Sequence, residues 1–343
     1  MPASKIICPF CSLHCDDRFL EPAAQGAWEV DTDCPKAAGE FARALNTAPV
    51  ARVDSSDATV NQVATFVAEQ FSSRPILNVV TAGTDLATAR HLQGMASAGK
   101  IQLLIDDCPS ATAWRTASGR EGSVTATLAD IRGHADLVWA LGDVERSHPK
   151  LLQRIDAGAK QGILTERLTA TAVANLFASI RSGKPMGTAQ SIREAKYLAI
   201  LVGEGAFESD EAIETAELLA KLLWFLNQTH RAVVLSLDPA ATNRSVSAWQ
   251  TNTTLENLSD DRWFSTPIDV RIGNRYHHPR TAIVQIGGSD PGPDHATAYM
   301  PARTIGVDQA GVVIRGDSTV TLPLEAITDR NLSLAIEWLQ RWL

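Results

Sequence analysis

The amino-acid sequence predicts an α/β protein with a small cysteine-rich N-terminal domain followed by parallel-sheet domains. Two observations predict this class: short buried apolar strands alternate with helical patterns along most of the chain, and cysteines gather near the N-terminus. At 343 residues, with 45% hydrophobic and 20% charged residues, the chain is long enough for more than one core and too apolar for a disordered protein.

The N-terminal segment, residues 1–54, carries four of the five cysteines. Cys8, Cys11 and Cys15 form a C-x2-C-x3-C motif, and Cys34 follows 19 positions later, after a short strand predicted around Trp28. Thiolates at this spacing can converge on one centre, and four thiolates suit a [4Fe–4S] cluster or a structural zinc ion. Because a cytosolic chain rarely keeps disulfides, we expect a metal or cluster here; reduced cysteines without a metal are the alternative.

The first run of strand–helix alternation follows this segment. Val60, Val63, Val67 and Phe71 recur at helical spacing, and a Gly-containing turn ends the apolar strand that comes next. The predicted elements are, in order, a helix from Val60 to Phe71, a strand Ile76–Val80, a helix Leu86–Ser97, and strands Ile101–Ile105 and Asp136–Leu141. We expect these strands to share one mainly parallel sheet with a later strand, Thr281–Ile286.

A second run begins near residue 145. Its predicted elements are helices Ala172–Ser182 and Ser191–Ala195, strand Tyr197–Val202, helix Asp210–Asn227 and strand Ala232–Leu237. These two strands are expected in a second sheet. The stretch Asn252–Pro279 is polar and predicts an irregular return to the first sheet; after it we expect short strands near Thr304–Val307 and Val312–Ile314 and a C-terminal helix Leu332–Trp342.

Charge and hydropathy exclude several classes of partner. The 31 Lys and Arg residues against 39 Asp and Glu give a net charge of −8, whereas nucleic-acid binding depends on a surplus of cations. No apolar run approaches the roughly 18–20 residues that cross a bilayer. The N-terminus shows no secretory signal pattern, so we expect a cytoplasmic protein with no nucleic-acid or membrane partner.

Parallel sheets bind ligands at the carboxyl ends of their strands, so the loops there are the candidate binding loops. These loops are Thr81–Asp85, Asp106–Ser110, Gly142–Pro149, Gly203–Phe207, Asp238–Asn243 and Gly287–Pro293. Each also suits an ordinary turn, since Gly, Asp and Pro occur wherever a strand reverses. His277 and His278 are a poor metal pair, because adjacent strand residues point to opposite faces.

Four segments resemble the B-type subunit of formylmethanofuran dehydrogenases, which are molybdopterin or tungstopterin oxidoreductases. CPFCSLHCDD at Cys8–Asp17 is similar to the family's CPxCGxxCDD, and His134–Arg154 is similar to its ADVVVxWGxNPxxxHPRH segment. Asn243–Thr253, NRSVSAWQTNT, is similar to NxxGxxxVxxWQTG, and Ile283–Gly292 is similar to a strand followed by SDPG. The four segments occur in the family's order over most of the chain.

The resemblance implies a fold of two Rossmann-like domains, the second inserted in the first. The implied division is residues 1–54, residues 55–144 with 266–343, and the inserted residues 145–265. The resemblance also implies a [4Fe–4S] cluster at the four N-terminal cysteines and Cys108 as the catalytic metal ligand of a molybdopterin or tungstopterin. The pterin-binding residues that it implies are Gly142, His148, Asn243, Trp249, Gln250, Ser289, Asp290 and Pro291.

The chain departs from the family pattern in several of these loops. The family's metal-ligating Cys or selenocysteine lies two residues before Pro-Ser, and Asp106 takes that place here, with Cys108 directly before Pro109. Asp143 and Glu145 follow Gly142 where the family has Asn-Pro, and two family glycines are replaced. Since acidic residues repel a pyrophosphate and glycines allow close backbone approach to it, the pterin site is expected to have decayed.

A related assembly without a redox step fits this pattern. The formyltransferase/hydrolase complex of bacterial one-carbon metabolism transfers a formyl group from tetrahydromethanopterin to a furan carrier and releases formate. The resemblance implies a B-type scaffold subunit, with an amidohydrolase-type hydrolase subunit, a C-type subunit and a formyltransferase as partners. A redox-active B-type dehydrogenase subunit with a pterin and a [4Fe–4S] cluster is the alternative, and an unrelated zinc-stabilised binding module is a third interpretation.

Overall fold

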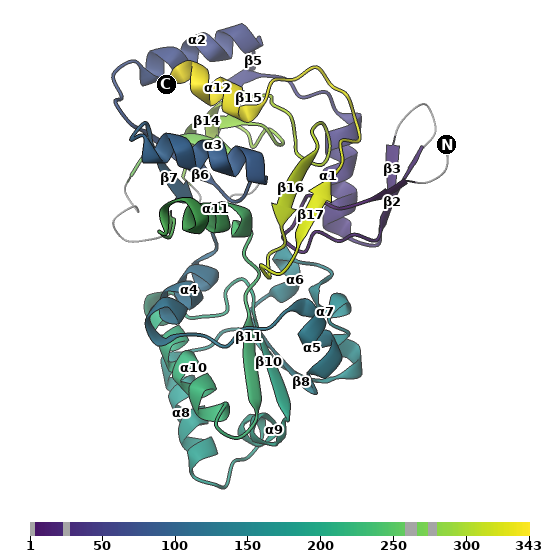
Figure 1. The fold of residues 1–343 in the computed structure, drawn as a ribbon, viewed down its shortest axis with the longest axis vertical. Coiled ribbons are helices and arrows are strands. Elements are labelled where there is room, and N and C mark those ends of the chain that lie inside the picture. The colour runs from purple at the N-terminus through teal and green to yellow at the C-terminus, as the bar shows by residue number, and fades with distance from the viewer. Residues whose placement is uncertain (1–3, 23–27, 258–265, 274–279) are drawn as a thin grey trace. The chain divides into compact units, whose positions relative to one another are not determined.

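The computed structural model describes residues 4–22, 28–257, 266–273 and 280–343. The His277-His278 pair lies outside these residues. The chain divides into two compact units. The first unit is formed by Met1–Asp107 together with Pro239–Leu343, and the second by the continuous segment Cys108–Asp238 (Figure 1).

The first unit contains an eight-stranded sheet in the order β12-β7-β6-β13-β14-β15-β4-β5. Its strands are β12 Glu256–Asn257, β7 Ile101–Ile105, β6 Leu77–Thr81, β13 Ile268–Ile272, β14 Ala282–Ile286, β15 Ala296–Met300, β4 Arg52–Val53 and β5 Ser56–Asp57. The pairings from β12 to β15 are parallel, and β4 and β5 join in antiparallel pairings at one end. The carboxyl ends of six parallel strands therefore meet at one edge of the sheet.

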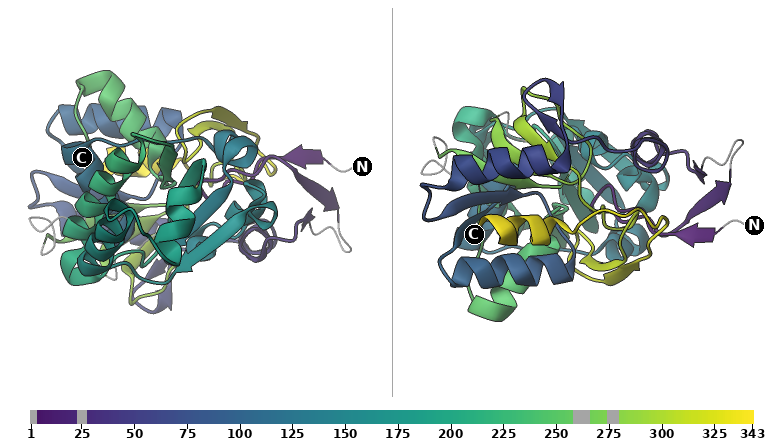
Figure 2. Two further views of the ribbon diagram at one scale, coloured as in Figure 1. Left: turned by 90° about the horizontal axis from the view of Figure 1, so that it is seen from below. Right: turned by 90° about the horizontal axis from the view of Figure 1, so that it is seen from above.

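Four helices accompany this sheet: α2 Val60–Phe71, α3 Leu86–Ser97, α11 Ala241–Thr251 and α12 Ala335–Trp342. Helix α2 begins at a capping box in which Thr59 and Gln62 satisfy each other's backbone N–H groups, and it buries Val63 and Val67. Asp85 caps α3 by accepting from the N–H groups of Ala87 and Thr88. Helix α12 lies between α2 and α3 in Figures 1 and 2 and contacts both.

The cysteine-rich segment folds as a small antiparallel sheet followed by a helix. Its elements are β1 Ser4–Ile6, β2 Arg18–Pro22, β3 Trp28–Asp31 and α1 Pro35–Asn46. The predicted strand around Trp28 is thus confirmed. A hairpin of β16 Gly311–Ile314 and β17 Thr321–Leu324 completes the first unit.

The second unit contains a four-stranded parallel sheet in the order β11-β10-β8-β9. Its strands are β8 Leu137–Leu141, β9 Gln161–Thr165, β10 Tyr197–Val202 and β11 Arg231–Leu235. Its helices are α4 Pro109–Glu121, α5 Leu128–His134, α6 Val144–Ser147, α7 Leu151–Arg154, α8 Ala170–Arg181, α9 Thr188–Glu194 and α10 Ala212–Leu226, with short 3-10 turns η2 Ala157–Ala159 and η3 Ser209–Glu211. Trp139 lies at the centre of its core, and the indole N–H donates to Thr165 Oγ1 at 2.9 Å.

The α/β class with parallel sheets is confirmed, but four details differ from expectation. The strand Asp136–Leu141, expected in the first sheet, is β8 of the second sheet, because it pairs with β10 rather than with β6 or β7. The units accordingly divide after Asp107 and Asp238 instead of near residues 144 and 265. The stretch expected to be irregular contains β13, a central strand, and Thr304–Val307 forms a turn rather than a strand. Treatment of residues 1–54 as a separate domain stays a prediction.

Candidate functional site

The three cysteines of the motif lie in one turn between β1 and β2. The Cys8 N–H donates to the Cys15 carbonyl at 2.9 Å and the His14 N–H donates to the Cys11 carbonyl at 3.0 Å, which folds the segment back on itself. His14 has a φ of 44°, a left-handed conformation that tightens this turn. All three cysteines are buried and remain as thiols.

Cys34 approaches the same turn from the start of α1. It occupies the N-cap position, and its N–H donates to Thr32 Oγ1 at 3.0 Å. Burial raises the pKa of the Cys8 thiol far above its ordinary value, and the neighbouring thiols of Cys11, Cys15 and Cys34 raise it further. All three are therefore electrostatic neighbours of Cys8.

The chemistry of this four-thiol group fits zinc or an iron–sulfur cluster, because soft thiolates are the ligands of both. Its arrangement is not that of a closed site: within the described residues, no group of three or more His, Cys, Asp or Glu side chains is placed to hold a metal ion. A metal would have to draw the sulfur atoms together and displace their protons. Occupancy by zinc or a cluster is accordingly a proposal.

Cys108 begins the second unit as the N-cap residue of α4. Its Sγ accepts a hydrogen bond from the Ala111 N–H at 3.4 Å. Burial raises the pKa of Cys108, the Ala111 N–H lowers it in part, and the Glu204 carboxylate raises it again. The thiol is therefore protonated at neutral pH, whereas a metal-ligating or nucleophilic cysteine acts as the thiolate.

Asp106 and Asp107 follow β7 in the first unit, and both are buried. A carboxylate oxygen of Asp107 lies 3.6 Å from the Arg244 guanidinium, which also donates to the Leu255 carbonyl at 3.2 Å. Burial lowers the pKa of Arg280, and the charge of Asp106 opposes that shift, so these two groups are also electrostatic neighbours. The resemblance implies a thiolate ligand at the position of Asp106. The chain has a carboxylate there, and this carboxylate is an electrostatic neighbour of the Arg280 guanidinium.

The loop after β6 lies at the switch point of the first sheet, between β6 and β13, where doubly wound folds bind ligands. The start of α11 fills this position. A Cβ at Gly83 would lie 2.2 Å from the Pro239 carbonyl oxygen. The Thr84 N–H donates to Asn243 Oδ1 at 2.9 Å, and Asn243 Nδ2 donates back to Thr84 Oγ1 at 3.0 Å. Asn243, predicted to bind a pterin, instead has its amide engaged by a neighbouring loop.

The other predicted pterin residues of the first unit lie on an exposed helix face or in the loop after β14. Trp249 and Gln250, on α11, are exposed, Trp249 by 65%. Ser289 and Pro291 flank Asp290 in the loop after β14. Asp290 forms a two-pronged ion pair with Arg52, with N–O distances of 2.7 and 2.8 Å, and accepts from the Gly292 N–H at 2.9 Å. This carboxylate anchors its loop to β4.

Gly142 and His148 belong to the second unit. Gly142 has a φ of 67°, and a Cβ there would lie 2.4 Å from the Glu204 carbonyl oxygen and 2.6 Å from the Ala206 nitrogen. The loops after β8 and β10 thus close on each other, with the Asp143 N–H donating to Glu204 at 2.8 Å. Nδ1 of His148 lies 3.0 Å from Ser147 Oγ. Gly142 therefore has a packing role that needs no ligand.

The predicted residues thus fall into separate groups, and the thiol group gathers more of them than any other. The first unit holds the four thiols, Asn243 with Trp249 and Gln250, and the loop of Asp290; the second holds Cys108, Gly142 and His148. Sequence patterns missed the buried cation Arg52 and the partly buried cations Arg244 and Arg280, because an isolated arginine gives no signal that distinguishes a buried partner from a surface charge.

Comparisons with known proteins give a likeness in fold. No described protein family and no curated protein matches the chain. Among solved structures, a chain of the X-ray crystal structure of the formyltransferase/hydrolase complex from Methylorubrum extorquens, in complex with methylofuran, superposes with a TM-score of 0.63 at 18% identity. The match covers 85% of this chain and 97% of that chain, so the two share a fold. Within the described residues, no helix is long and apolar enough to cross a membrane.

Proposed function

We propose that this chain is the B-type scaffold subunit of a formyltransferase/hydrolase complex in tetrahydromethanopterin-linked one-carbon metabolism. The observation that carries the proposal is the shared fold, which covers 97% of a chain from such a complex. The four similar segments of the sequence, in the same order as in the B-type subunit of formylmethanofuran dehydrogenases, agree with it.

The proposed role is non-redox because the loops that resemble a pterin site are engaged with the protein's own groups. The amide of Asn243 is bonded to Thr84, the carboxylate of Asp290 to Arg52, and Gly142 packs on the Glu204 backbone. Burial raises the pKa of Cys108 and so disfavours the thiolate that a metal would need. A pterin metal site needs a thiolate ligand and open backbone around the pyrophosphate, and these contacts oppose both.

The partners in this proposal are a metal-dependent amidohydrolase-type subunit, a C-type subunit and a formyltransferase. The chain would hold the hydrolase subunit in place while that partner performs the chemistry on the furan carrier. The four-thiol group of Cys8, Cys11, Cys15 and Cys34 would serve to stabilise the N-terminal segment, with zinc or a [4Fe–4S] cluster as its ligand.

The experiment is to tag this chain in its native host, isolate the assembly and identify its subunits. The purified assembly is then supplied with formylated tetrahydromethanopterin and the furan carrier, and formate release is measured without any electron acceptor. Oxidation of the formylated furan carrier is measured in parallel with an artificial acceptor. The Cys108→Ser variant is carried through both assays.

Formate release that is equal in the wild type and in Cys108→Ser, with no acceptor-dependent oxidation, is the expected result. Acceptor-dependent oxidation that disappears in Cys108→Ser would establish the alternative, a redox-active B-type subunit of a dehydrogenase. Isolation of the chain without a hydrolase or formyltransferase subunit would contradict both.

A further inference from the structure

Strand β9 forms one edge of the sheet in the second unit, and its outer side has no partner among the described residues. The Gln161 N–H donates to the Asp136 carbonyl at 3.1 Å, and the Thr165 carbonyl accepts from Gly142 at 2.8 Å. These two residues direct their backbone groups toward β8. By the alternation of a strand, Gly162 and Leu164 direct theirs outward, where a further strand could pair.

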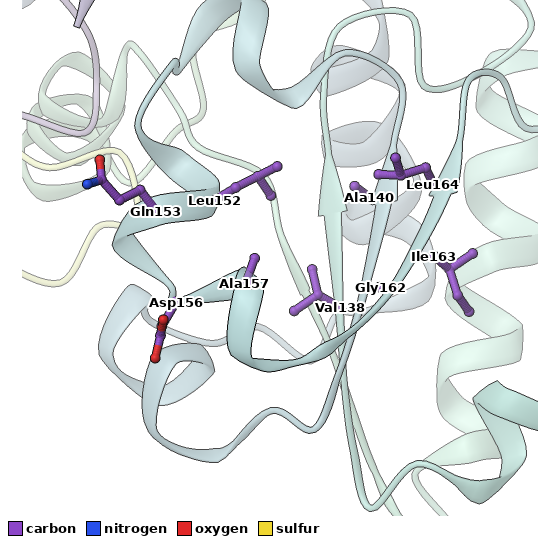
Figure 3. Close-up of a pocket in the computed structure, with 10 residues that line it drawn as sticks. Val138, Ala140, Leu152, Gln153, Asp156, Ala157, Gly162, Ile163 and Leu164 are labelled. Atoms are coloured by element: carbon purple, nitrogen blue, oxygen red, sulfur yellow. The ribbon is translucent and has the colours of Figure 1, made fainter. Parts of the chain in front are cut away.

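An apolar hollow of about 540 Å³ lies on one face of the sheet beside this edge (Figure 3). Its floor is formed by Val138 and Ala140 of β8 and by Gly162 of β9, and its wall by Leu152 and Ala157. A Cβ at Gly162 would meet nothing within 4 Å, so the floor is open there.

Leu164 stands beside this hollow on the same face and is 80% exposed. A leucine so exposed, next to an apolar hollow and on an unpaired strand edge, is a surface that soluble proteins usually cover. The strand also carries no charged residue between Lys160 and Glu166. Edge strands are commonly protected by such charges, and β9 has none within it.

We propose that a second copy of this chain docks here, with β9 pairing antiparallel to its counterpart about a two-fold axis at Ile163. The two four-stranded sheets then form one continuous eight-stranded sheet. The proposal concerns the second unit alone and is independent of the proposed function.

The register follows from the sequence of the strand. Outward-directed residues must face outward-directed residues, which leaves three two-fold registers near the strand centre. One places Gly162 opposite Gly162 and Leu164 opposite Lys160. Another places Leu164 opposite Leu164 and Gly162 opposite Glu166.

The third register places Gly162 opposite Leu164 and Lys160 opposite Glu166. Directly opposed residues of antiparallel strands point to the same face, so each Leu164 enters the hollow above the partner's Gly162, where no side chain competes. Lys160 lies opposite Glu166 in this register, but its ammonium donates to the carbonyls of Arg132 and Ala135 at 2.9 Å in its own copy, so the register depends on the fit of Leu164 to Gly162. This is the only one of the three registers that fits a large apolar side chain to an empty position, and symmetry repeats the contact.

The test is the oligomeric state of the full chain, measured by sedimentation velocity from about 1 to 100 µM. A reversible dimer is expected. Leu164→Ala removes the side chain that enters the partner's hollow, and Gly162→Leu fills the position that this side chain would occupy. Each variant should weaken dimerisation at least about 100-fold, because two leucine burials are lost per dimer. Met186→Ala is the matched control, since Met186 is 82% exposed in the same unit but lies off this edge. Circular dichroism of each monomer should match the wild type.

Cysteine crosslinking tests the register itself. Ile163 would face its counterpart in a non-hydrogen-bonded pair, whose Cα separation of about 4.5 Å suits a disulfide. Under mild oxidation Ile163→Cys should form a covalent dimer, and Ile76→Cys, an exposed site in the other unit, should not.

Three results would overturn the proposal. One is a wild-type chain that stays monomeric at 100 µM. Another is crosslinking of Ile163→Cys no faster than that of Ile76→Cys. The third is a Leu164→Ala variant that dimerises normally but no longer binds a different subunit, which would assign the hollow to that subunit instead.

Discussion

Replacing Asp290 with alanine should destabilise the first unit, although the resemblance assigns this residue to a cofactor loop. The Arg52 guanidinium, whose side chain is 8% exposed, holds both carboxylate oxygens of Asp290 at 2.7 and 2.8 Å. The same guanidinium donates to the carbonyls of Ala296 and Thr297 on β15. Asp290→Ala removes its only carboxylate partner among the described residues and leaves the cation largely buried.

The magnitude follows from the burial of the pair. Removing one partner of a fully buried ion pair costs about 3–5 kcal/mol. Asp290 is 32% exposed and Arg52 keeps its carbonyl partners, so the lower end, about 3 kcal/mol, is expected. For a unit of this size, 1 kcal/mol shifts the midpoint of thermal unfolding by about 2–4 °C, and the expected loss is therefore about 6–12 °C.

The assay is thermal unfolding followed by calorimetry, with Asp294→Ala as the control. Asp294 lies in the same connection between β14 and β15, its side chain is exposed, and its backbone carbonyl, which accepts from Thr281, is unchanged by the substitution. Combining Asp290→Ala with Arg52→Leu should cost less than the sum of the single changes, because no buried cation is left without its carboxylate. A midpoint for Asp290→Ala that equals that of Asp294→Ala would refute the structural role.

Three further predictions concern other groups. Gly142→Ala should lower the free energy of unfolding in urea by about 2–4 kcal/mol, because its Cβ would clash with the Glu204 backbone at a left-handed φ; an unchanged midpoint would contradict the packing role. Burial alone would raise the pKa of Asp308, but hydrogen bonds from Arg330 and Thr328 outweigh it and the pKa is lowered. Its stabilisation is therefore complete above about pH 4 and is lost as the pH falls through the lowered pKa, and the unfolding of Asp308→Asn should depend less on acid over that range. The alkylation rate of Cys108 should still be rising above pH 9, and a plateau near pH 7 would show that its thiol is activated after all.

Local patterns in the sequence predict the elements well, and their partners less well. The helix Val60–Phe71 and the strand Tyr197–Val202 have the predicted bounds, because helical spacing and a continuous apolar run are properties of the segment itself. The sheet that contains β8 could not be predicted in this way. A strand that is buried on both faces looks the same in either sheet, and the pairing with β10 is a long-range contact.

Strand β13 was missed for a different physical reason. Its sequence, IDVRI, places two charged residues in a strand whose five residues are all buried. Asp269 accepts from the Asn78 N–H at 2.7 Å and pairs with Arg74, while Arg271 donates to the carbonyls of His295 and Arg280, each at 2.9 Å. Polar composition predicts a loop unless these distant partners are known.

In the candidate site, too, local features could be predicted from the sequence and long-range contacts could not. The spacing of Cys8, Cys11 and Cys15 predicts a shared turn, and the structure has it. Arg52 and Asp290, by contrast, are 238 positions apart, so no local pattern predicts that this carboxylate is already engaged. The sequence therefore points to the loops of a candidate site, and only the fold shows which of their side chains are engaged by internal contacts.

The most direct test of the non-redox scaffold role is the molybdenum and tungsten content of the isolated assembly, measured by mass spectrometry on the same preparation that releases formate. For a non-redox scaffold we expect full formate release with neither metal present above background. Stoichiometric molybdenum or tungsten per copy of this chain, together with oxidation that depends on Cys108, would contradict it.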